Sequence, residues 1–207
     1  MPLFGEFEIP KHKDFDDGAT GQIRIGGSKA GVAYTTDTLR ITADDEATLE
    51  TLAKAHGGEV AEWETNKSDR FELLTTIKAV VVDLFSWNAG FERWHEKKLV
   101  VQCDGKEQRD GSPCECPASI SERKELAKVG KACKPKFKAQ VCFPDSPELG
   151  KFRFESGAWS LVNKSNDIEQ HVADGPAPIE IAIGDFTNNK GQLVRFPKVS
   201  IKDPVKS

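Results

Sequence analysis

A group of four cysteines in the middle of the chain is the feature that most constrains how it can fold. The four are separated by ten, one and sixteen residues. Four thiolates complete a closed tetrahedral zinc site, and zinc adds no geometric preference of its own. Turn-forming residues flank the cysteines, with Asp104-Gly105 after the first and Pro117 after the third. The sequence therefore predicts one structural zinc ion held by Cys103, Cys114, Cys116 and Cys133.

Other uses of these cysteines are weaker hypotheses. A chain of 207 residues can bury a core without covalent staples, and a reducing compartment disfavours disulfides. An iron–sulfur cluster also takes four thiolates, but the sequence contains nothing that resembles a redox-partner site. His95 is an alternative ligand, although it follows Trp94 in a segment expected to be an aromatic helix. Cys142 lies in an apolar stretch and is expected to be a small core residue.

The apolar residues do not form a membrane anchor. The longest apolar run, residues 79–82, stops at Asp83, whereas a membrane-spanning helix needs roughly 18–20 apolar residues. The first fifteen residues mix charged with apolar side chains, unlike a signal peptide. The sequence therefore predicts a cytoplasmic protein with no membrane contact.

The charge is acidic overall but uneven. A net charge of −4 argues against a protein whose main task is to grip duplex DNA. Residues 123–138 nevertheless carry seven lysines and arginines against one glutamate. We interpret this basic segment as a solvated face around the metal loop, whose cations would offset the charge of four thiolates. A contact with phosphate or with an acidic partner is the alternative.

The periodicity of apolar residues predicts many strands and few helices. A helix is expected over 44–56, with Thr42 or Asp44 as its N-cap and Gly57-Gly58 at its end. Aromatic residues at helical spacing, Trp87, Phe91 and Trp94, predict a second helix over 86–96, and a third is expected over 158–172. Strands are expected at 21–25, 36–42, 59–63, 71–74, 77–82, 137–143, 152–156, 179–183 and 193–201.

These elements indicate an α+β fold. We expect a mixed, mostly antiparallel sheet with two or three helices and an inserted zinc-bound loop of four cysteines. Residues 1–20 are predicted to be a flexible leader, and 203–207 a disordered tail. A single domain is expected over 21–202, with the zinc loop inserted at 103–133.

Catalytic motifs are not visible in the sequence. It has no histidine-rich cluster, no nucleophile elbow and no recognisable pair of carboxylates. Four cysteine ligands would also leave no open position on zinc for a reactive water molecule. The sequence therefore predicts that the protein is not an enzyme.

Distinctive blocks of residues extend from about position 20 to position 200. They are GQIRIG (21–26), TDTLRIT (36–42), HGGEV (56–60), an aromatic segment ending at Trp94, CDG (103–105), PCECP (113–117), ACKP (132–135), FPD (143–145) and LGKFRFES (149–156). In this order and spacing, the sequence resembles the recombination directionality factors of actinobacterial phages, which are partners of large serine integrases.

The resemblance implies a function that composition could not indicate. Such a factor binds its integrase, on the integrase–DNA complex, and switches it from integration to excision between the hybrid sites attL and attR. Its own contact with DNA is expected to be indirect or weak. The alternative is an accessory replication protein that binds single-stranded nucleic acid through the basic segment and exposed aromatic side chains such as Trp87 or Trp94.

Overall fold

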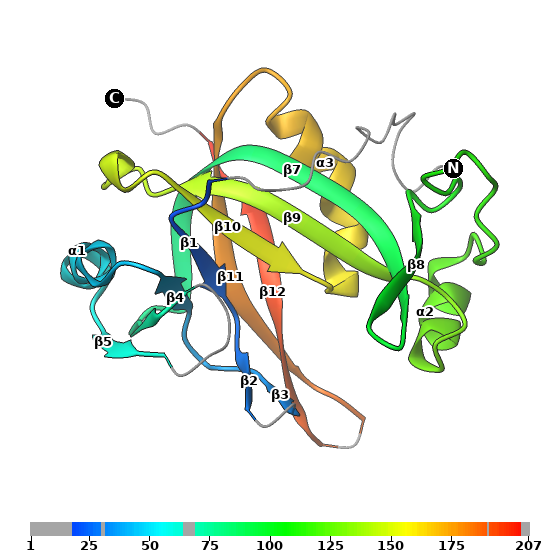
Figure 1. The fold of residues 1–207 in the computed structure, drawn as a ribbon, viewed down its shortest axis with the longest axis horizontal. Helices are drawn as coiled ribbons and strands as arrows, with labels where there is room; N and C mark the ends of the chain where they lie inside the picture. Colours follow the sequence, from blue (N-terminus) through cyan, green and yellow to red (C-terminus); the bar gives the residue numbers. More distant parts are fainter. Residues whose placement is uncertain (1–17, 30–31, 64–68, 190, 204–207) are drawn as a thin grey trace.

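The computed structural model of the protein describes residues 18–29, 32–63, 69–189 and 191–203 (Figure 1). Most of the expected leader, residues 1–17, and most of the expected tail, residues 204–207, lie outside the described residues. The elements are β1 (Gly21–Arg24), β2 (Gly27–Lys29), β3 (Val32–Tyr34), β4 (Arg40–Ala43), α1 (Glu46–His56), β5 (Glu59–Glu62), β6 (Phe71–Leu74), β7 (Ala79–His95), β8 (Lys98–Cys103), α2 (Ile120–Lys128), β9 (Lys134–Cys142), η1 (Pro147–Leu149), β10 (Lys151–Ser156), η2 (Trp159–Lys164), α3 (Ser165–His171), β11 (Ala177–Thr187) and β12 (Leu193–Ile201).

One large sheet organises the described part of the chain. Its strands follow the order β12-β11-β7-β9-β10-β1-β4-β6-β5, and β8 pairs with the far part of β7. Only β1 and β10 pair in parallel among the described strands; the other pairs are antiparallel. Strands β2 and β3 form a separate two-stranded ribbon. The predicted α+β class with a mixed, mostly antiparallel sheet is therefore confirmed.

The helices cover separate parts of the sheet. α1 packs on β4, β5 and β6, and α3 packs on β7 and η2. Figure 1 shows α1 at one end of the sheet and α2 at the other, near the hairpin of β7 and β8. Alternate residues of the central strands point inward, and those of β9 and β10 include the fully buried Phe137, Phe152 and Phe154. None of the described helices is long and apolar enough to cross a membrane.

The N-cap of the first helix lies three residues after Thr42 and one residue after Asp44, the two predicted caps. Asp45, rather than Thr42 or Asp44, is the N-cap, and its carboxylate accepts from the backbone N–H of Thr48 at 2.9 Å. Thr42 is instead buried in β4. The predicted end is confirmed, because Gly57 adopts a positive φ of 66° at the C-cap.

The predicted helix over 86–96 is wrong, because this segment is the second half of β7. Residues four apart lie on one face of a strand as well as of a helix, so Trp87 and Phe91 fit both patterns. A β-bulge between Leu84 and Ser86 conceals the alternation. Before it the buried residues of β7 are even-numbered, and after it they are odd-numbered.

Candidate metal centre

The ends of the cysteine loop lie on two sides of one residue of β7. Phe91 pairs with Cys103, the last residue of β8, and also with Pro135 near the start of β9. Cys133 directly precedes β9. Because β8 and β9 flank the same strand, the sheet brings the first and last cysteines of the loop together before the loop contributes any contact of its own.

Backbone hydrogen bonds then fold the first half of the loop back onto β8. The Asp104 carboxylate accepts from the N–H groups of Lys106 and Glu107, each at 2.7 Å, and Gly105 adopts a φ of 109°. This turn places the Lys106 carbonyl where the Cys114 N–H donates to it at 2.6 Å. The predicted turn after the first cysteine is therefore the feature that returns the second cysteine to it.

All four predicted cysteines meet at this point. The Cys114 thiol donates to the Cys103 sulfur at 3.3 Å, and the backbone N–H of Cys133 donates to the Cys116 sulfur at 3.2 Å. Cys103 and Cys133 are fully buried, whereas Cys114 and Cys116 are half-buried. All four are free thiols.

Hydrogen bonds and burial shift the thiol pKa values in opposite directions. The Cys133 thiol donates to the Cys103 sulfur, which is the main cause that lowers the pKa of Cys103 to about 6. The same hydrogen bond raises the pKa of Cys133, because that thiol must keep its proton to donate. Burial is the main cause that raises the pKa of Cys114 to about 12. Among these three thiols, Cys103 therefore loses its proton most readily.

The sulfurs have the spacing of hydrogen-bonded thiols. Two thiolates on one tetrahedral zinc ion lie roughly 3.8 Å apart, given Zn–S bonds of about 2.3 Å, and the Cys103 and Cys114 sulfurs are closer than this. As the side chains stand, no group of three or more His, Cys, Asp or Glu residues in the described chain is placed to hold a metal ion. The chemistry of the donor set nevertheless fits zinc, because all four converging groups are thiols.

Arg123 is a residue of the cysteine cluster that sequence reasoning missed. It belongs to the basic segment that we interpreted as solvated, yet its side chain is fully buried. Nε donates to the Pro117 carbonyl at 2.9 Å, Nη2 donates to the Gly105 carbonyl at 2.8 Å, and the guanidinium lies 4.6 Å from the Phe91 ring centroid. Its buried Nη1 has no hydrogen-bond partner among the described residues. A cation is therefore buried beside the thiols, where its charge helps to lower the pKa of Cys103.

The other residues considered from the sequence lie elsewhere. His95 is 77% exposed at the end of β7, where it pairs with Lys98 rather than joining the cysteine cluster. Cys142 is buried at the opposite end of β9, as predicted. Trp87 is 6% exposed and donates to the Ser165 hydroxyl at 2.8 Å, so it cannot stack on a nucleic-acid base. Trp94, in contrast, is 57% exposed.

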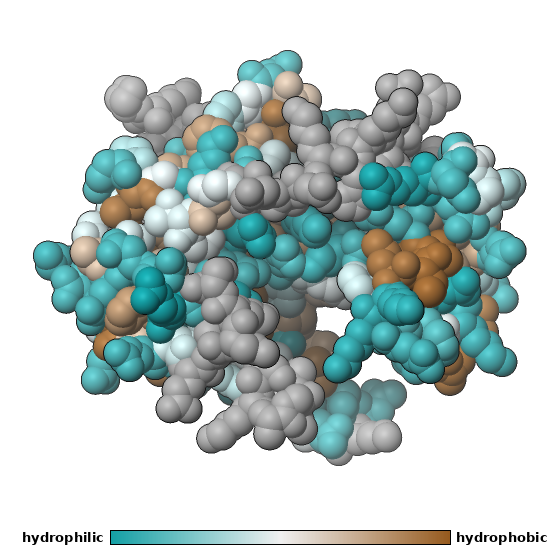
Figure 2. Space-filling view, in the orientation of Figure 1, coloured by the Kyte–Doolittle hydropathy of each residue, from teal (hydrophilic) through white to brown (hydrophobic). Residues whose placement is uncertain are grey.

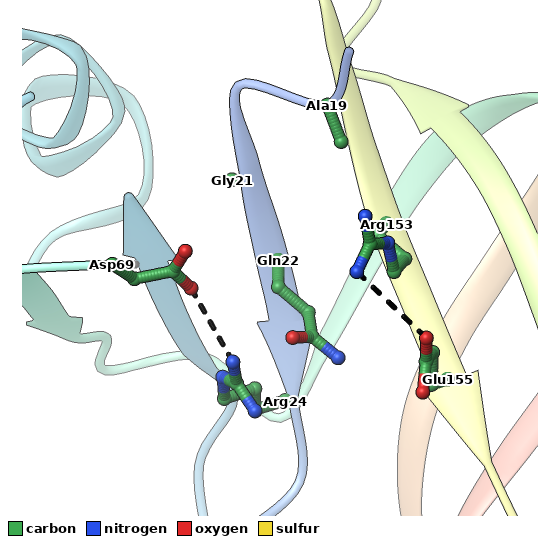
Figure 3. A pocket seen from close by; sticks show the side chains of 7 residues that line it. All are labelled: Ala19, Gly21, Gln22, Arg24, Asp69, Arg153 and Glu155. Carbon is green, nitrogen blue, oxygen red and sulfur yellow. Dashed lines mark hydrogen bonds and ion pairs between the residues drawn. The ribbon is translucent and has the colours of Figure 1, made fainter. Parts of the chain in front are cut away.

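A pocket of about 350 Å³ lies away from the cysteines, beside β1 and β10 (Figure 3). Its lining includes two arginines and two carboxylates, and these pair with each other. Arg24 lies 3.3 Å from the Asp69 carboxylate, and Arg153 lies 3.9 Å from Glu155. Because the charges of the lining balance, the pocket favours neither an anionic nor a cationic ligand.

A comparison of the sequence with models of known protein families gives a match over most of the chain. The sequence model of the Gp3-like family, described as recombination directionality factor-like, matches residues 20–182. The chain belongs to this family. The match runs from β1 into β11 and includes the whole cysteine loop, which confirms the resemblance seen in the sequence. No solved structure matches the chain. Membership of the recombination directionality factor-like family connects the protein with DNA recombination and with a recombinase as its partner.

Proposed function

We propose that this protein binds a large serine integrase, assembled on its attachment-site DNA, and switches it from integration to excision between attL and attR. The observation that carries the proposal is the family match over residues 20–182. The protein acts without cleaving DNA, because the integrase supplies the serine nucleophile. Its place of action is the cytoplasm of the bacterial host.

The switch requires a difference in affinity between two arrangements of the integrase. To change a preference from 1:99 to 99:1, a ligand must bind one arrangement about 10⁴-fold more tightly than the other. A rigid protein surface favours such discrimination, because it loses little conformational entropy on binding. The cysteine loop, fixed at both ends beside β7, supports this type of surface.

The test is recombination in vitro with a purified large serine integrase and DNA carrying its attachment sites. With the protein present, we expect attL × attR recombination to increase and attP × attB recombination to decrease, as measured by the fraction of product DNA. Trp87→Phe, which keeps a buried aromatic side chain, serves as a folded control and should behave as the wild type. Unchanged recombination between both pairs of sites would contradict the proposal.

We also propose that the four cysteines hold a structural zinc ion. Cys103, Cys114, Cys116 and Cys133 would supply the ligands, and zinc would supply a tetrahedral cross-link but no reactive position. Four thiolates on zinc carry a net charge of −2, and the buried Arg123 offsets part of it. The unpartnered Nη1 of Arg123 supports this assignment. A buried donor needs an acceptor, and a zinc-bound thiolate sulfur would be one.

Replacement of two ligands tests the zinc site. Cys114→Ser together with Cys116→Ser should abolish zinc binding, measured by elemental analysis, and should lower the thermal midpoint, because structural zinc contributes directly to folding. Cys142→Ala removes a buried cysteine outside the loop and should keep one zinc per chain. Full zinc content in the double variant would rule out these four residues as the ligand set.

A further inference from the structure

The tip of the β7–β8 hairpin carries exposed apolar side chains that the fold does not require. Trp94 is 57% exposed, Val100 is 50% exposed and Leu99 is 39% exposed. Trp94 and Leu99 are direct cross-strand partners. Figure 2 shows an apolar patch at this end of the molecule, surrounded by hydrophilic surface. Exposed apolar patches with a polar rim commonly mark protein interaction sites.

Local backbone geometry presents these side chains. The two residues of the hairpin loop, Glu96 and Lys97, both have positive φ angles, 47° and 65°. The register shifts between Arg93 and Trp94, so Val100 is left without a cross-strand partner. Such bulges redirect side chains at sheet edges. In the described residues no other named strand pairs with β8, and the loop contacts only its end, at Gln102 and Cys103, so its outer edge at residues 99–101 is open.

The Trp94 indole is already oriented. Its Nε1 donates to the Glu92 carboxylate at 3.0 Å. An oriented aromatic side chain loses little entropy on binding, and tryptophan is among the residues that contribute most to protein interfaces. The patch therefore has an anchor suited to binding another protein.

The charges around the patch specify the chemistry of its partner. Five basic side chains lie on or directly beside the hairpin, against two carboxylates at Glu92 and Glu96. Lys134 pairs with Glu92 across the strands, and Arg93 Nη1 donates to the Lys131 carbonyl at 3.4 Å, so the segment after α2 contributes to this rim. The five basic residues are Arg93, Lys97, Lys98, Lys131 and Lys134.

An apolar centre with a basic rim fits a protein surface that is apolar at its centre and acidic around it. A second copy of this chain fits poorly, because a symmetric contact would place the same basic rim against itself. DNA also fits poorly, because Leu99 and Val100 would face phosphates. The partner is therefore a different protein.

We infer that the hairpin tip, centred on Trp94, Leu99 and Val100, is the surface that docks on the integrase, at an apolar integrase surface with an acidic rim. This inference rests on the proposed function. It also gives the cysteine loop a role, because β8 ends at Cys103 and the loop therefore fixes the base of the hairpin.

The test measures binding of the full chain to the purified integrase on attL DNA. Trp94→Ala with Val100→Ser should raise Kd at least about 30-fold, as expected when an interface anchor is removed. The matched control is Phe186→Ala with Leu193→Ser, on the β11–β12 hairpin, where the side chains are 52% and 55% exposed. We expect the control to bind within threefold of the wild type, about the scatter expected of peripheral contacts.

A charge-reversed variant tests the rim without changing the apolar centre. Lys97→Glu with Lys98→Glu should slow association at least about tenfold at low salt, because the rim would then repel acidic groups. If the apolar double variant melts earlier than the wild type, this charge-reversed variant still tests whether the hairpin tip docks on the integrase.

The outcomes separate the two proposals. If the wild-type protein does not bind the integrase, the proposed function fails and the docking surface fails with it. If the wild type binds and both hairpin variants bind equally well, only the docking surface is overturned. Equal losses in the hairpin variant and the β11–β12 control would also overturn it, because binding would then depend on exposed apolar residues in general.

Discussion

Arg123 connects three parts of the cysteine region through one side chain. It donates to the Gly105 carbonyl within the first turn of the loop and to the Pro117 carbonyl after the cysteine pair, and its guanidinium lies over the Phe91 ring of β7. The sequence did contain a signal for this position. Ser119 caps α2, with Glu122 three residues later, and this Ser-x-x-Glu pattern marks a helix start. On that helix Arg123 and Ala127 share the buried face.

Arg123→Lys should destabilise the protein although it keeps the charge. A lysine cannot reproduce the forked donors that bind the Pro117 and Gly105 carbonyls, so one buried carbonyl is left unsatisfied. We expect the free energy of unfolding, measured by urea denaturation, to fall by about 1–3 kcal/mol. Lys124→Arg, the reverse exchange at an exposed neighbour, should change it by less than about 0.5 kcal/mol. Equal stability of Arg123→Lys and wild type would show that the fork is not needed.

The cysteines were easier to predict from sequence than the arginine. Their residue type and the turn at Asp104-Gly105 specify that the four thiols must meet, and the structure brings them together. Burial of Arg123 depends on α2 folding back over Phe91, which is distant in sequence. A run of positive charge in a sequence does not distinguish an inward-facing arginine from the exposed lysines beside it.

At the scale of elements, a single extra residue in β7 explains why the apolar periodicity wrongly predicted a helix over 86–96. Most of the strands of the sheet could be predicted, because alternation is clear in segments such as β9 and β10. The bulge at Phe85 breaks the alternation of β7, and the aromatic residues after it then imitate a helix. The error matters for the proposed docking surface and for the cysteine loop, because Trp94 and also Phe91, which pairs with Cys103 and Pro135, lie in the misassigned segment.

Substitutions in the turn between β7 and β8 should stabilise the protein. Glu96 and Lys97 have left-handed backbone angles that cost side chains about 1–2 kcal/mol per residue. Asparagine followed by glycine suits a two-residue hairpin loop of this type. We expect Glu96→Asn with Lys97→Gly to raise the free energy of unfolding by about 1 kcal/mol, because glycine's greater freedom in the unfolded chain offsets part of the gain.

Removal of the charges alone provides the control for this turn. Glu96→Ala with Lys97→Ala changes the same positions without relieving the backbone, so its denaturation midpoint should not exceed that of the wild type. A similar gain in both variants would assign the effect to charge instead of backbone conformation.

At the scale of the whole molecule, the net charge of −4 coexists with a basic segment whose charges are partly satisfied. Arg123 is buried, Lys128 pairs with Glu125 at 2.6 Å, and Lys136 pairs with Glu155. Without integrase, we therefore expect no gel shift of attachment-site duplex at about 10 μM protein and 150 mM salt. A shift under these conditions that weakens steeply with added salt would demonstrate direct DNA contact.

The two outer edges of the large sheet are protected against pairing with other chains. Pro197 lies within β12 and has no N–H to offer another strand, and β5 carries exposed glutamates at both of its ends. Strand β8 of the hairpin contains neither a proline nor a glutamate, and its Leu99 and Val100 are exposed. This contrast is consistent with a sheet whose outer edges do not pair with other chains, while the proposed protein contact is made by the β7–β8 hairpin.

The parallel pairing of β1 with β10 determines when the sheet can close as the chain is made. Thr20, beside β1, donates to the Leu149 carbonyl, 129 residues further along the chain. Closure over such a distance is slow, and it must wait until β10 has left the ribosome. The cysteine loop is synthesised earlier, between β8 and β9. Strands β7, β8 and β9 are therefore complete in the nascent chain before β10 is, so the four thiols can come together before β1 finds its parallel partner.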